Sequence, residues 1–325
     1  MRHRVLSLLA SLTVLLAALV GTDLDTTLVE AAHPAQADAI LTAAAPAREE
    51  AVASVPAPVL RQETSVAAVA APIEQETARY VAADPIPTYT FVPPPTTNGQ
   101  PVRLMVALHG MGGSGADMAT MLGPLAAQRG WAILAPTMPY RDYRDPELVR
   151  RDGELLPRLR SLIDALPART GLTFEKRVLF FGFSRGSQES IRFSLMFPDY
   201  TLGVAGLSAG SYTLPSSTAA DGRALKYPFG TADVDTICGQ KFDAAATQKI
   251  AYWIGVGGSD TKAEDVPRAW DQFVGTNRVE RAKRYVEILQ QFGARANLEV
   301  FPNAGHEVTG PMQEHAIQFL ATIAL

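Results

Sequence analysis

A serine pentapeptide between an apolar run and a helix-like segment constrains the fold more than any other part of the sequence. Residues 178–181 are β-branched and aromatic or leucine, which predicts a short buried strand. The pentapeptide GFSRG (residues 182–186) follows directly, and apolar residues then recur at helical spacing up to Phe197. A serine on such a tight strand-to-helix turn points its hydroxyl out at the carboxyl end of the sheet. The segment therefore predicts a nucleophile elbow with Ser184 at its tip.

A second pentapeptide of the same form, GLSAG at residues 206–210, also follows a strand-like run. The residues after it include Pro215 and several poor helix formers, so the chain cannot continue there as the helix that an elbow needs. Ser208 is therefore predicted to end the next strand. Ser184 remains the candidate nucleophile.

The first 84 residues are predicted to lie outside the folded domain. A basic stretch, residues 1–4, precedes an apolar run, residues 5–20, which is the pattern of a secretory signal. We assign residues 1–30 to a signal peptide or an uncleaved N-terminal anchor, and expect a secreted or membrane-tethered protein. Residues 31–84 are rich in Ala, Pro, Val, Glu and Gln and cannot bury enough apolar area to fold, which predicts a disordered linker. Residues 85–325 then form one domain.

Charge and cysteine content exclude several classes of protein. The net charge of −4 gives no support for binding to nucleic acid or to an anionic membrane surface. A single cysteine, Cys238, rules out an intramolecular disulfide, so the core must stabilise an exported domain unaided. No histidine adjoins Cys238, and we interpret it as a structural residue.

Strand-like and helix-like segments alternate along residues 85–325, which predicts a mostly parallel sheet covered by helices on both faces. The expected strands are 89–92, 102–108, 131–134, 178–181, 203–207, 250–256 and 300–301. Besides the helix that follows Ser184, the expected helices are 116–129, 146–166, 279–292 and 311–324. Residues 209–249 lack clear periodicity and are predicted to be a cap-like insertion. Its aromatic residues either line a substrate pocket or form the small core of the insertion. Residues 136–145, with two tyrosines and two arginines, either contact a polar substrate or form a solvated loop.

The glycine-rich loop GMGGSG at residues 110–115 allows two interpretations. It matches the dinucleotide-binding pattern, which also needs an acidic residue at the end of the following strand. No acidic residue occurs there before Asp142. Together with the predicted export, this disfavours a nicotinamide cofactor, and we expect neither a cofactor nor a metal ion.

The second interpretation of the glycine-rich loop is an oxyanion hole. Glycines let the backbone approach a substrate closely, so the N–H of Met111 or of Gly112 can bind an oxyanion. The N–H of Arg185, directly after the candidate nucleophile, is the expected second donor. His109 is then a structural residue that holds the loop.

A general base and its acidic partner can be chosen by position. The other histidines fall in the signal, the linker, the glycine loop and the terminal helix, which leaves His306 in the loop before that helix. Asp260 directly follows the strand at 250–256 and its glycines, and is the expected acid that orients the imidazole. Asp265, five residues later, is the alternative.

The chain order Ser184, Asp260, His306 is that of the α/β-hydrolases. The segments HGMGGSG, GFSRG, VGGSD and AGHE resemble those of exported esterases of the polyhydroxybutyrate-depolymerase, feruloyl-esterase and dienelactone-hydrolase-like type. The resemblance covers residues 102–325. It implies an α/β-hydrolase fold and hydrolysis of small or polymeric carboxylic esters through an acyl-enzyme, without a cofactor. The chain lacks the paired cysteines and the polymer-binding module of the depolymerases.

Two other classes of function stay open at this point. A peptidase or an acyltransferase would use the same three residues. A non-catalytic binding protein tethered to the cell envelope would retain the fold and make use of the long linker.

Overall fold

The computed structural model describes residues 73–77, 86–93 and 100–324. The predicted signal or anchor at residues 1–30 and most of the predicted linker at 31–84 lie outside these ranges. Within them, no helix combines the length and the apolar character needed to cross a membrane.

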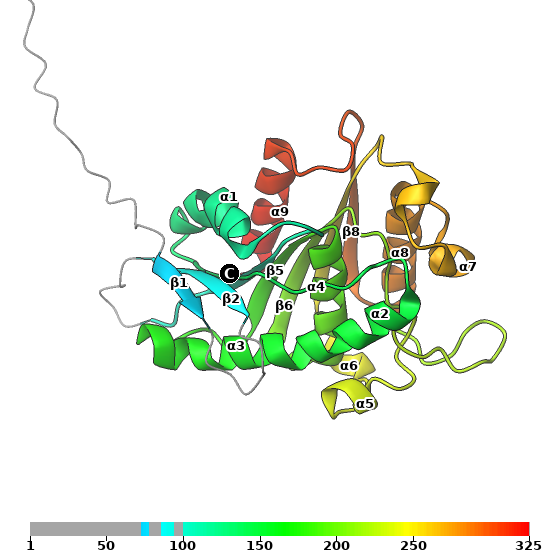
Figure 1. The fold of residues 1–325 in the computed structure, drawn as a ribbon, viewed down its shortest axis with the longest axis horizontal. Coiled ribbons are helices and arrows are strands. Elements are labelled where there is room, and N and C mark those ends of the chain that lie inside the picture. Colours follow the sequence, from blue (N-terminus) through cyan, green and yellow to red (C-terminus); the bar gives the residue numbers. More distant parts are fainter. Residues whose placement is uncertain (1–72, 78–85, 94–99, 325) are drawn as a thin grey trace, which may run out of the picture. The chain divides into compact units, whose positions relative to one another are not determined.

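Eight strands of the described residues form one sheet in the order β1-β2-β4-β3-β5-β6-β7-β8 (Figure 1). The six neighbouring strands β4, β3, β5, β6, β7 and β8 pair in parallel. The pairs β1 with β2 and β2 with β4 are antiparallel. The strands are β1 Ile73–Thr77, β2 Pro87–Phe91, β3 Leu104–Leu108, β4 Ala132–Pro136, β5 Val178–Phe183, β6 Thr201–Leu207, β7 Ala251–Gly257 and β8 Arg295–Phe301. The predicted α/β fold with a mostly parallel sheet is confirmed.

Helices cover both faces of this sheet. Residues of α1 and α9 share one apolar core with the sheet, and residues of α3, α4 and α8 share the other. The helices are α1 Gly115–Ala127, α2 Pro146–Arg151, α3 Leu155–Thr170, α4 Arg185–Met196, α5 Asp235–Cys238, α6 Ala244–Thr247, α7 Asp271–Val274, α8 Arg278–Phe292 and α9 Gly310–Ile323. The central strands are buried on both faces, which explains why they read as continuous apolar runs.

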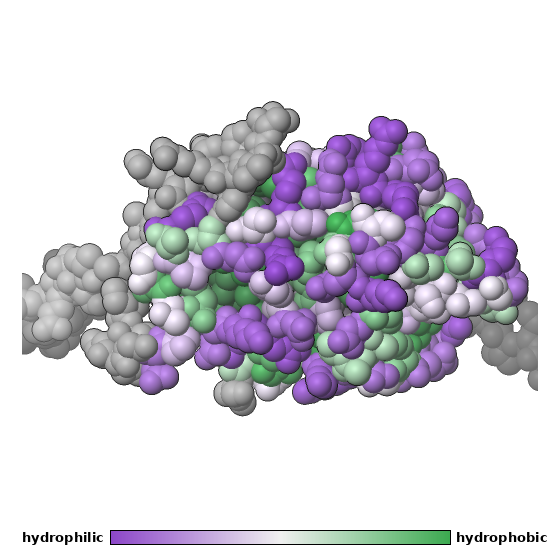
Figure 2. All heavy atoms as spheres, turned by 90° about the horizontal axis from the view of Figure 1, so that it is seen from below, coloured by the Kyte–Doolittle hydropathy of each residue, from purple (hydrophilic) through white to green (hydrophobic). Residues whose placement is uncertain are grey.

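The outer surface is mixed in character. On the face seen in Figure 2, hydrophilic and hydrophobic residues are interspersed. Among the large apolar side chains of the described residues, Met111 stands out with an exposed fraction of 43%. Met111 belongs to the glycine-rich loop between β3 and α1, so this exposed side chain lies next to the predicted site.

Three elements differ from the sequence-based expectation. The helix expected over 146–166 is divided into α2, a 3-10 turn at Asp152–Glu154, and α3. The turn buries the Asp152 carboxylate completely, where it forms an ion pair with Arg185. The strand expected at 300–301 begins at Arg295, because an edge strand with an exposed face carries polar residues that hide its periodicity.

The third difference is β1, which lies inside the segment predicted to be a disordered linker. Residues Ile73–Thr77 pair antiparallel with β2, with Thr77 opposite Pro87. Pairing between strands satisfies backbone N–H and C=O groups whatever the side chains are, so amino-acid composition does not predict this strand. The remaining residues of the predicted linker, 31–72 and 78–84, are not described.

The insertion between β6 and β7 is present at 209–249, and its aromatic side chains pack within the fold. The Tyr212 ring stacks on Tyr285 with centroids 4.2 Å apart. Phe229 packs on Trp270 at 4.6 Å and Phe242 on Phe292 at 6.0 Å, and all three partner rings lie outside the insertion. Of the two interpretations of these residues, the structure therefore favours packing over substrate contact.

Replacement of Trp270 tests how this insertion is held. The Trp270 side chain is fully buried and its indole N–H donates to the Tyr212 carbonyl at 2.8 Å. Trp270→Phe leaves that carbonyl buried and unpaired, so we expect a loss of about 1–3 kcal/mol in unfolding free energy. Trp253→Phe is the control, since its indole donates to Glu299, whose side chain is 34% exposed and can turn to water. Urea denaturation should show the larger loss for Trp270→Phe; equal losses would contradict this account.

Candidate active site

Ser184 lies on a strained turn between β5 and α4. Its backbone has φ 52° and ψ −112°, a conformation that costs about 1–3 kcal/mol for a residue with a side chain. The surrounding structure holds it there: the Ser184 N–H donates to the Leu207 carbonyl at 2.8 Å. A Cβ added at Gly186 would lie 2.1 Å from the Leu108 carbonyl oxygen, and one at Gly182 would lie 2.5 Å from the Gly186 oxygen. The two glycines of the pentapeptide are therefore required by close backbone approach.

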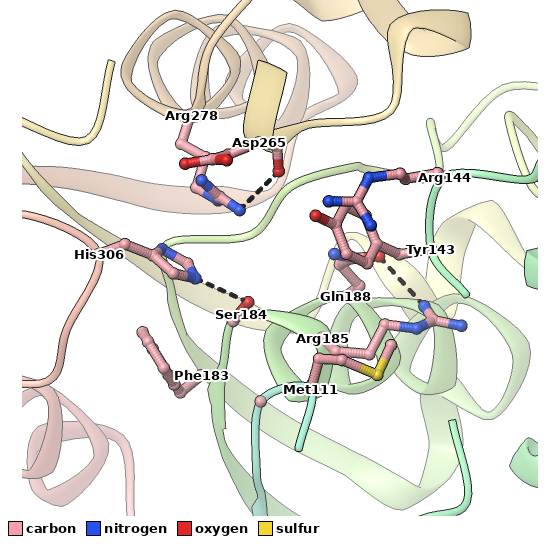
Figure 3. Close-up of a pocket in the computed structure, with 11 residues that line it drawn as sticks. Met111, Tyr143, Arg144, Phe183, Ser184, Arg185, Gln188, Asp265, Arg278 and His306 are labelled. Carbon is pink, nitrogen blue, oxygen red and sulfur yellow. Dashed lines mark hydrogen bonds between the residues drawn. The ribbon is translucent and has the colours of Figure 1, made fainter. Parts of the chain in front are cut away.

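Three side chains predicted from the sequence are brought together by loops at the carboxyl ends of the strands. His306, in the loop after β8, has its Nε2 atom 3.0 Å from the Ser184 hydroxyl (Figure 3). Its Nδ1 atom lies 2.7 Å from a carboxylate oxygen of Asp260, in the loop after β7. Ser184 and Asp260 are buried, whereas the His306 side chain is 34% exposed. A hydrogen-bonded chain thus runs from a hydroxyl to a buried carboxylate.

Arg278, at the start of α8, is a member of the site that sequence reasoning missed. Its guanidinium forms an ion pair with the second Asp260 oxygen at 3.0 Å and donates to the Asp265 carbonyl at 2.8 Å. Burial by itself would raise the pKa of the Asp260 carboxyl, but the His306 hydrogen bond and the Arg278 charge lower it below its ordinary value. An arginine at a helix start, 18 residues after its partner, carries no signal in the sequence.

Asp265 and Ser208, the sequence-based alternatives to Asp260 and Ser184, do not join this hydrogen-bonded chain. The Asp265 side chain lines the cavity but does not bond His306, which bonds Asp260 instead. Ser208 also has a positive φ of 50°, yet it is fully buried and, among the described residues, its hydroxyl has no hydrogen-bond partner. Geometry thus separates the two serine pentapeptides.

The glycine-rich loop between β3 and α1 lies against Ser184. A Cβ added at Gly110 would be 3.2 Å from the Ser184 Cβ atom. His109 fixes the loop: its Nε2 accepts from the Met138 N–H at 2.9 Å and its Nδ1–H donates to the Gly110 carbonyl at 2.6 Å. Burial lowers the pKa of His109, which keeps this imidazole neutral. His109 therefore has the structural place expected of it.

A cavity of about 410 Å³ opens beside Ser184. Met111 and Arg185, the expected oxyanion donors, line it, whereas Gly112 is not among its lining residues. Insertion 209–249 contributes no lining residue. The lining residues are Gly110, Met111, Tyr143, Arg144, Phe183, Ser184, Arg185, Gln188, Asp265, Arg278 and His306.

Some residues of the loop at 136–145 line the cavity, and others contact the protein interior. Tyr143 and Arg144 line the cavity (Figure 3). Tyr140 lies under the Arg185 guanidinium, 5.3 Å from its central carbon, and Arg141 pairs with Asp152 at 2.9 Å. Tyr143 and Arg144 are thus placed where they could meet a substrate, whereas Tyr140 and Arg141 contact buried residues, so the loop is not simply solvated.

No group of three or more His, Cys, Asp or Glu side chains in the described part of the chain can hold a metal ion. Cys238 is half-buried, and its thiol donates to the Val234 carbonyl at 3.1 Å. Burial raises the pKa of this thiol, which disfavours the reactive thiolate. The structural interpretation of Cys238 agrees with these contacts.

Known proteins share this fold. No protein-family model matches the sequence, and no curated protein matches it. Among solved structures, a poly(aspartic acid) hydrolase from Sphingomonas sp. KT-1 is similar with a TM-score of 0.60 and 21% identity, over 76% of this chain and 98% of that one. A poly(3-hydroxybutyrate) depolymerase from Bordetella parapertussis is similar with a TM-score of 0.56 and 22% identity, over 78% and 90% of the two chains. The chain therefore has the α/β-hydrolase fold, as its sequence motifs predict.

The close contacts of Gly186 generate a first prediction for the site. Gly186→Ala forces a Cβ against the Leu108 carbonyl, so we expect a loss of at least about 1–3 kcal/mol in stability and displacement of Ser184. Gly123→Ala, in α1, meets no atom within 4 Å and should instead be neutral or stabilising by up to about 1 kcal/mol. Thermal denaturation of both variants measures this. Equal melting temperatures would contradict the packing argument.

Asp260 also predicts how stability depends on pH. Its pKa is lower in the folded protein than the value near 3.9 expected in the unfolded chain. The ionised carboxylate therefore stabilises the fold above about pH 4, and this contribution is lost as the pH falls through the folded-state pKa. In urea denaturation between pH 3 and 7, Asp260→Asn should lack part of the acid-induced loss seen in the wild type. Parallel pH curves for the two proteins would contradict this.

Proposed function

We propose that the protein is a serine hydrolase that cleaves carboxylic esters. The observation that carries the proposal is the unbroken hydrogen-bonded chain from the Ser184 hydroxyl through His306 to Asp260, beside an open cavity. Each member of such a triad needs the next: the hydroxyl needs a base, and the base needs a group that fixes its tautomer. Asp260, held ionised by Arg278, supplies the latter.

The reaction proceeds in two halves. Ser184 attacks the ester carbonyl while the Nε2 atom of His306 takes the hydroxyl proton, and Asp260 stabilises the imidazolium. The N–H groups of Met111 and Arg185 bind the oxyanion, each worth about 3 kcal/mol. The C–O bond to the alcohol then breaks, and His306 returns the proton to the leaving alcohol. Water attacks the acyl-enzyme with the same base, which releases the acid and restores Ser184.

The proposal includes a location outside the cytoplasm. The basic and apolar pattern of residues 1–20 supports export, either with release after cleavage or with a tether through the N-terminus. The Ala- and Pro-rich segment before β1, residues 31–72, would then separate the domain from the membrane in the tethered form.

Two serine variants test the function. Ser184→Ala should abolish hydrolysis of p-nitrophenyl esters, with a loss of roughly a millionfold in kcat, and abolish labelling by a fluorophosphonate probe. Ser208→Ala is the matched control, because it removes a buried hydroxyl that bonds nothing in the described residues. It should label and turn over like the wild type.

The alternative classes predict different results. A peptidase or acyltransferase would label at Ser184 but prefer an amide substrate or transfer to an added alcohol or amine. A binding protein with this fold would not label at all. Ser184-independent hydrolysis would overturn the proposal.

A further inference from the structure

Two cavities, the larger one of mixed character and the smaller one mainly apolar, meet beside Ser184. The larger one, of about 410 Å³, contains the hydroxyl and the imidazole, and the smaller one, of about 180 Å³, lies between α1 and the loop after β8. Both are lined by Gly110, Met111 and Phe183, so they share a wall. Resting on the function proposed above, we propose that the ester spans this wall, with an apolar alcohol of about six carbons in the smaller cavity and an acyl group bearing an uncharged oxygen acceptor in the larger.

The smaller cavity offers apolar surface. Met118, Met121 and Val308 line it together with the shared residues. Of its polar members, His109 has both ring nitrogens hydrogen-bonded, and Asp117 is exposed to solvent with one carboxylate oxygen accepting from the N–H and the hydroxyl of Ser114 at 3.0 and 2.8 Å. Methionine side chains adapt to the shape of an apolar ligand. An apolar cavity of about 150 Å³ takes a benzene-sized molecule, so this one suits a group of about six carbons.

The position of the imidazole decides which half of the ester enters the smaller cavity. His306 must protonate the leaving alcohol, so the alcohol oxygen lies at its Nε2 atom. The Phe183 ring packs on this imidazole with centroids 5.0 Å apart and forms part of the shared wall. Val308, two residues further along the chain, lines the smaller cavity. The leaving group therefore passes to the apolar side, and the acyl group extends the other way along α4.

Gln188 provides a hydrogen-bond donor in the larger cavity, on the side proposed for the acyl group. Its Oε1 atom accepts from Ser211 at 2.8 Å, from Arg185 at 3.1 Å and from Arg192 at 3.4 Å. Rotation of the amide would bring its NH₂ group against two guanidinium cations, so the orientation is fixed by charge. The side chain is 3% exposed and lines the larger cavity (Figure 3). Its NH₂ group is thus a preoriented donor one helical turn after Ser184.

The charges of the larger cavity favour an uncharged acceptor. Arg144 and Asp265 both line it and have opposite signs. Arg278 is engaged by Asp260 and by the Asp265 carbonyl. A hydroxyl, ether or carbonyl oxygen can accept from Gln188 without facing either uncompensated charge.

The alcohol side is tested with alkyl esters of one acid, from methyl to octyl, by following proton release from the full chain. We expect kcat/KM to rise up to about the hexyl ester and then level off. Met121→Trp fills the smaller cavity and should lower the hexyl-to-methyl ratio of kcat/KM about tenfold or more. Thr120→Trp adds the same ring at an exposed neighbouring position of α1 and should leave the ratio unchanged.

The acyl side is tested with a matched pair, hexyl pentanoate and hexyl 3-methoxypropanoate, which differ by one CH₂ replaced with oxygen. The wild type should prefer the ether. Gln188→Glu keeps an acceptor for Ser211 and both arginines but removes the NH₂ donor, so the preference should fall about three- to tenfold. Met121→Trp should not alter it.

The outcomes separate this inference from the function it rests on. Ser184-dependent turnover with a flat alcohol profile, or with no preference for the ether, overturns the inference and leaves the ester hydrolase standing. If Met121→Trp changes the dependence of kcat/KM on the length of the acyl group instead of the alcohol, the smaller cavity binds the acyl group. That result also overturns the inference. Absence of both turnover and fluorophosphonate labelling overturns the proposed function itself.

Discussion

A buried ion-pair network around the first turns of α4 is the constraint on which the site depends. The Arg185 side chain, 1% exposed, contacts Asp152 at 2.5 Å and Glu189 at 2.8 Å, and Arg192 reaches the same Glu189 oxygen at 3.2 Å. Loss of one partner from such a group leaves a buried charge and costs about 3–5 kcal/mol. The network joins three parts of the chain: α4, the turn at Asp152–Glu154 and, through Arg141, the loop that forms one side of the cavity. Its second effect is chemical, because it fixes the amide of Gln188.

The site combines a rigid half and an assembled half. Ser184 and the glycine-rich loop are positioned by backbone contacts between neighbouring strands, where glycines are the only residues that fit. His306 and Asp260 come instead from loops after β8 and β7, and are aligned by hydrogen bonds and by Arg278. Contacts at the centre of the sheet therefore hold the strained backbone of Ser184, while loops nearer the edge of the sheet align His306.

The sequence predicts the central strands, the elbow and the three members of the hydrogen-bonded chain, because each rests on a local pattern: an apolar run, a glycine spacing, a residue directly after a strand. It does not predict β1 or the start of β8, since edge strands are stabilised by backbone pairing and carry polar residues. Nor does it predict the roles of Arg278 and Gln188. Both are polar residues on helices, which usually face water, and only the tertiary structure shows that they are buried against charged partners.

The placement of His306 has a consequence for how the protein would lose the proposed activity. β8 is the last strand of the sheet, bonded on one side to β7 alone, and the least buried of the strands for which burial is described. Edges of this kind open locally at a lower free energy than the centre of a fold. Because the loop after β8 carries the imidazole, such an opening separates His306 from the Ser184 hydroxyl while the turn at Ser184 and the glycine-rich loop stay intact. Inactivation by heat or denaturant should then precede the cooperative unfolding of the core, and be reversible over that interval.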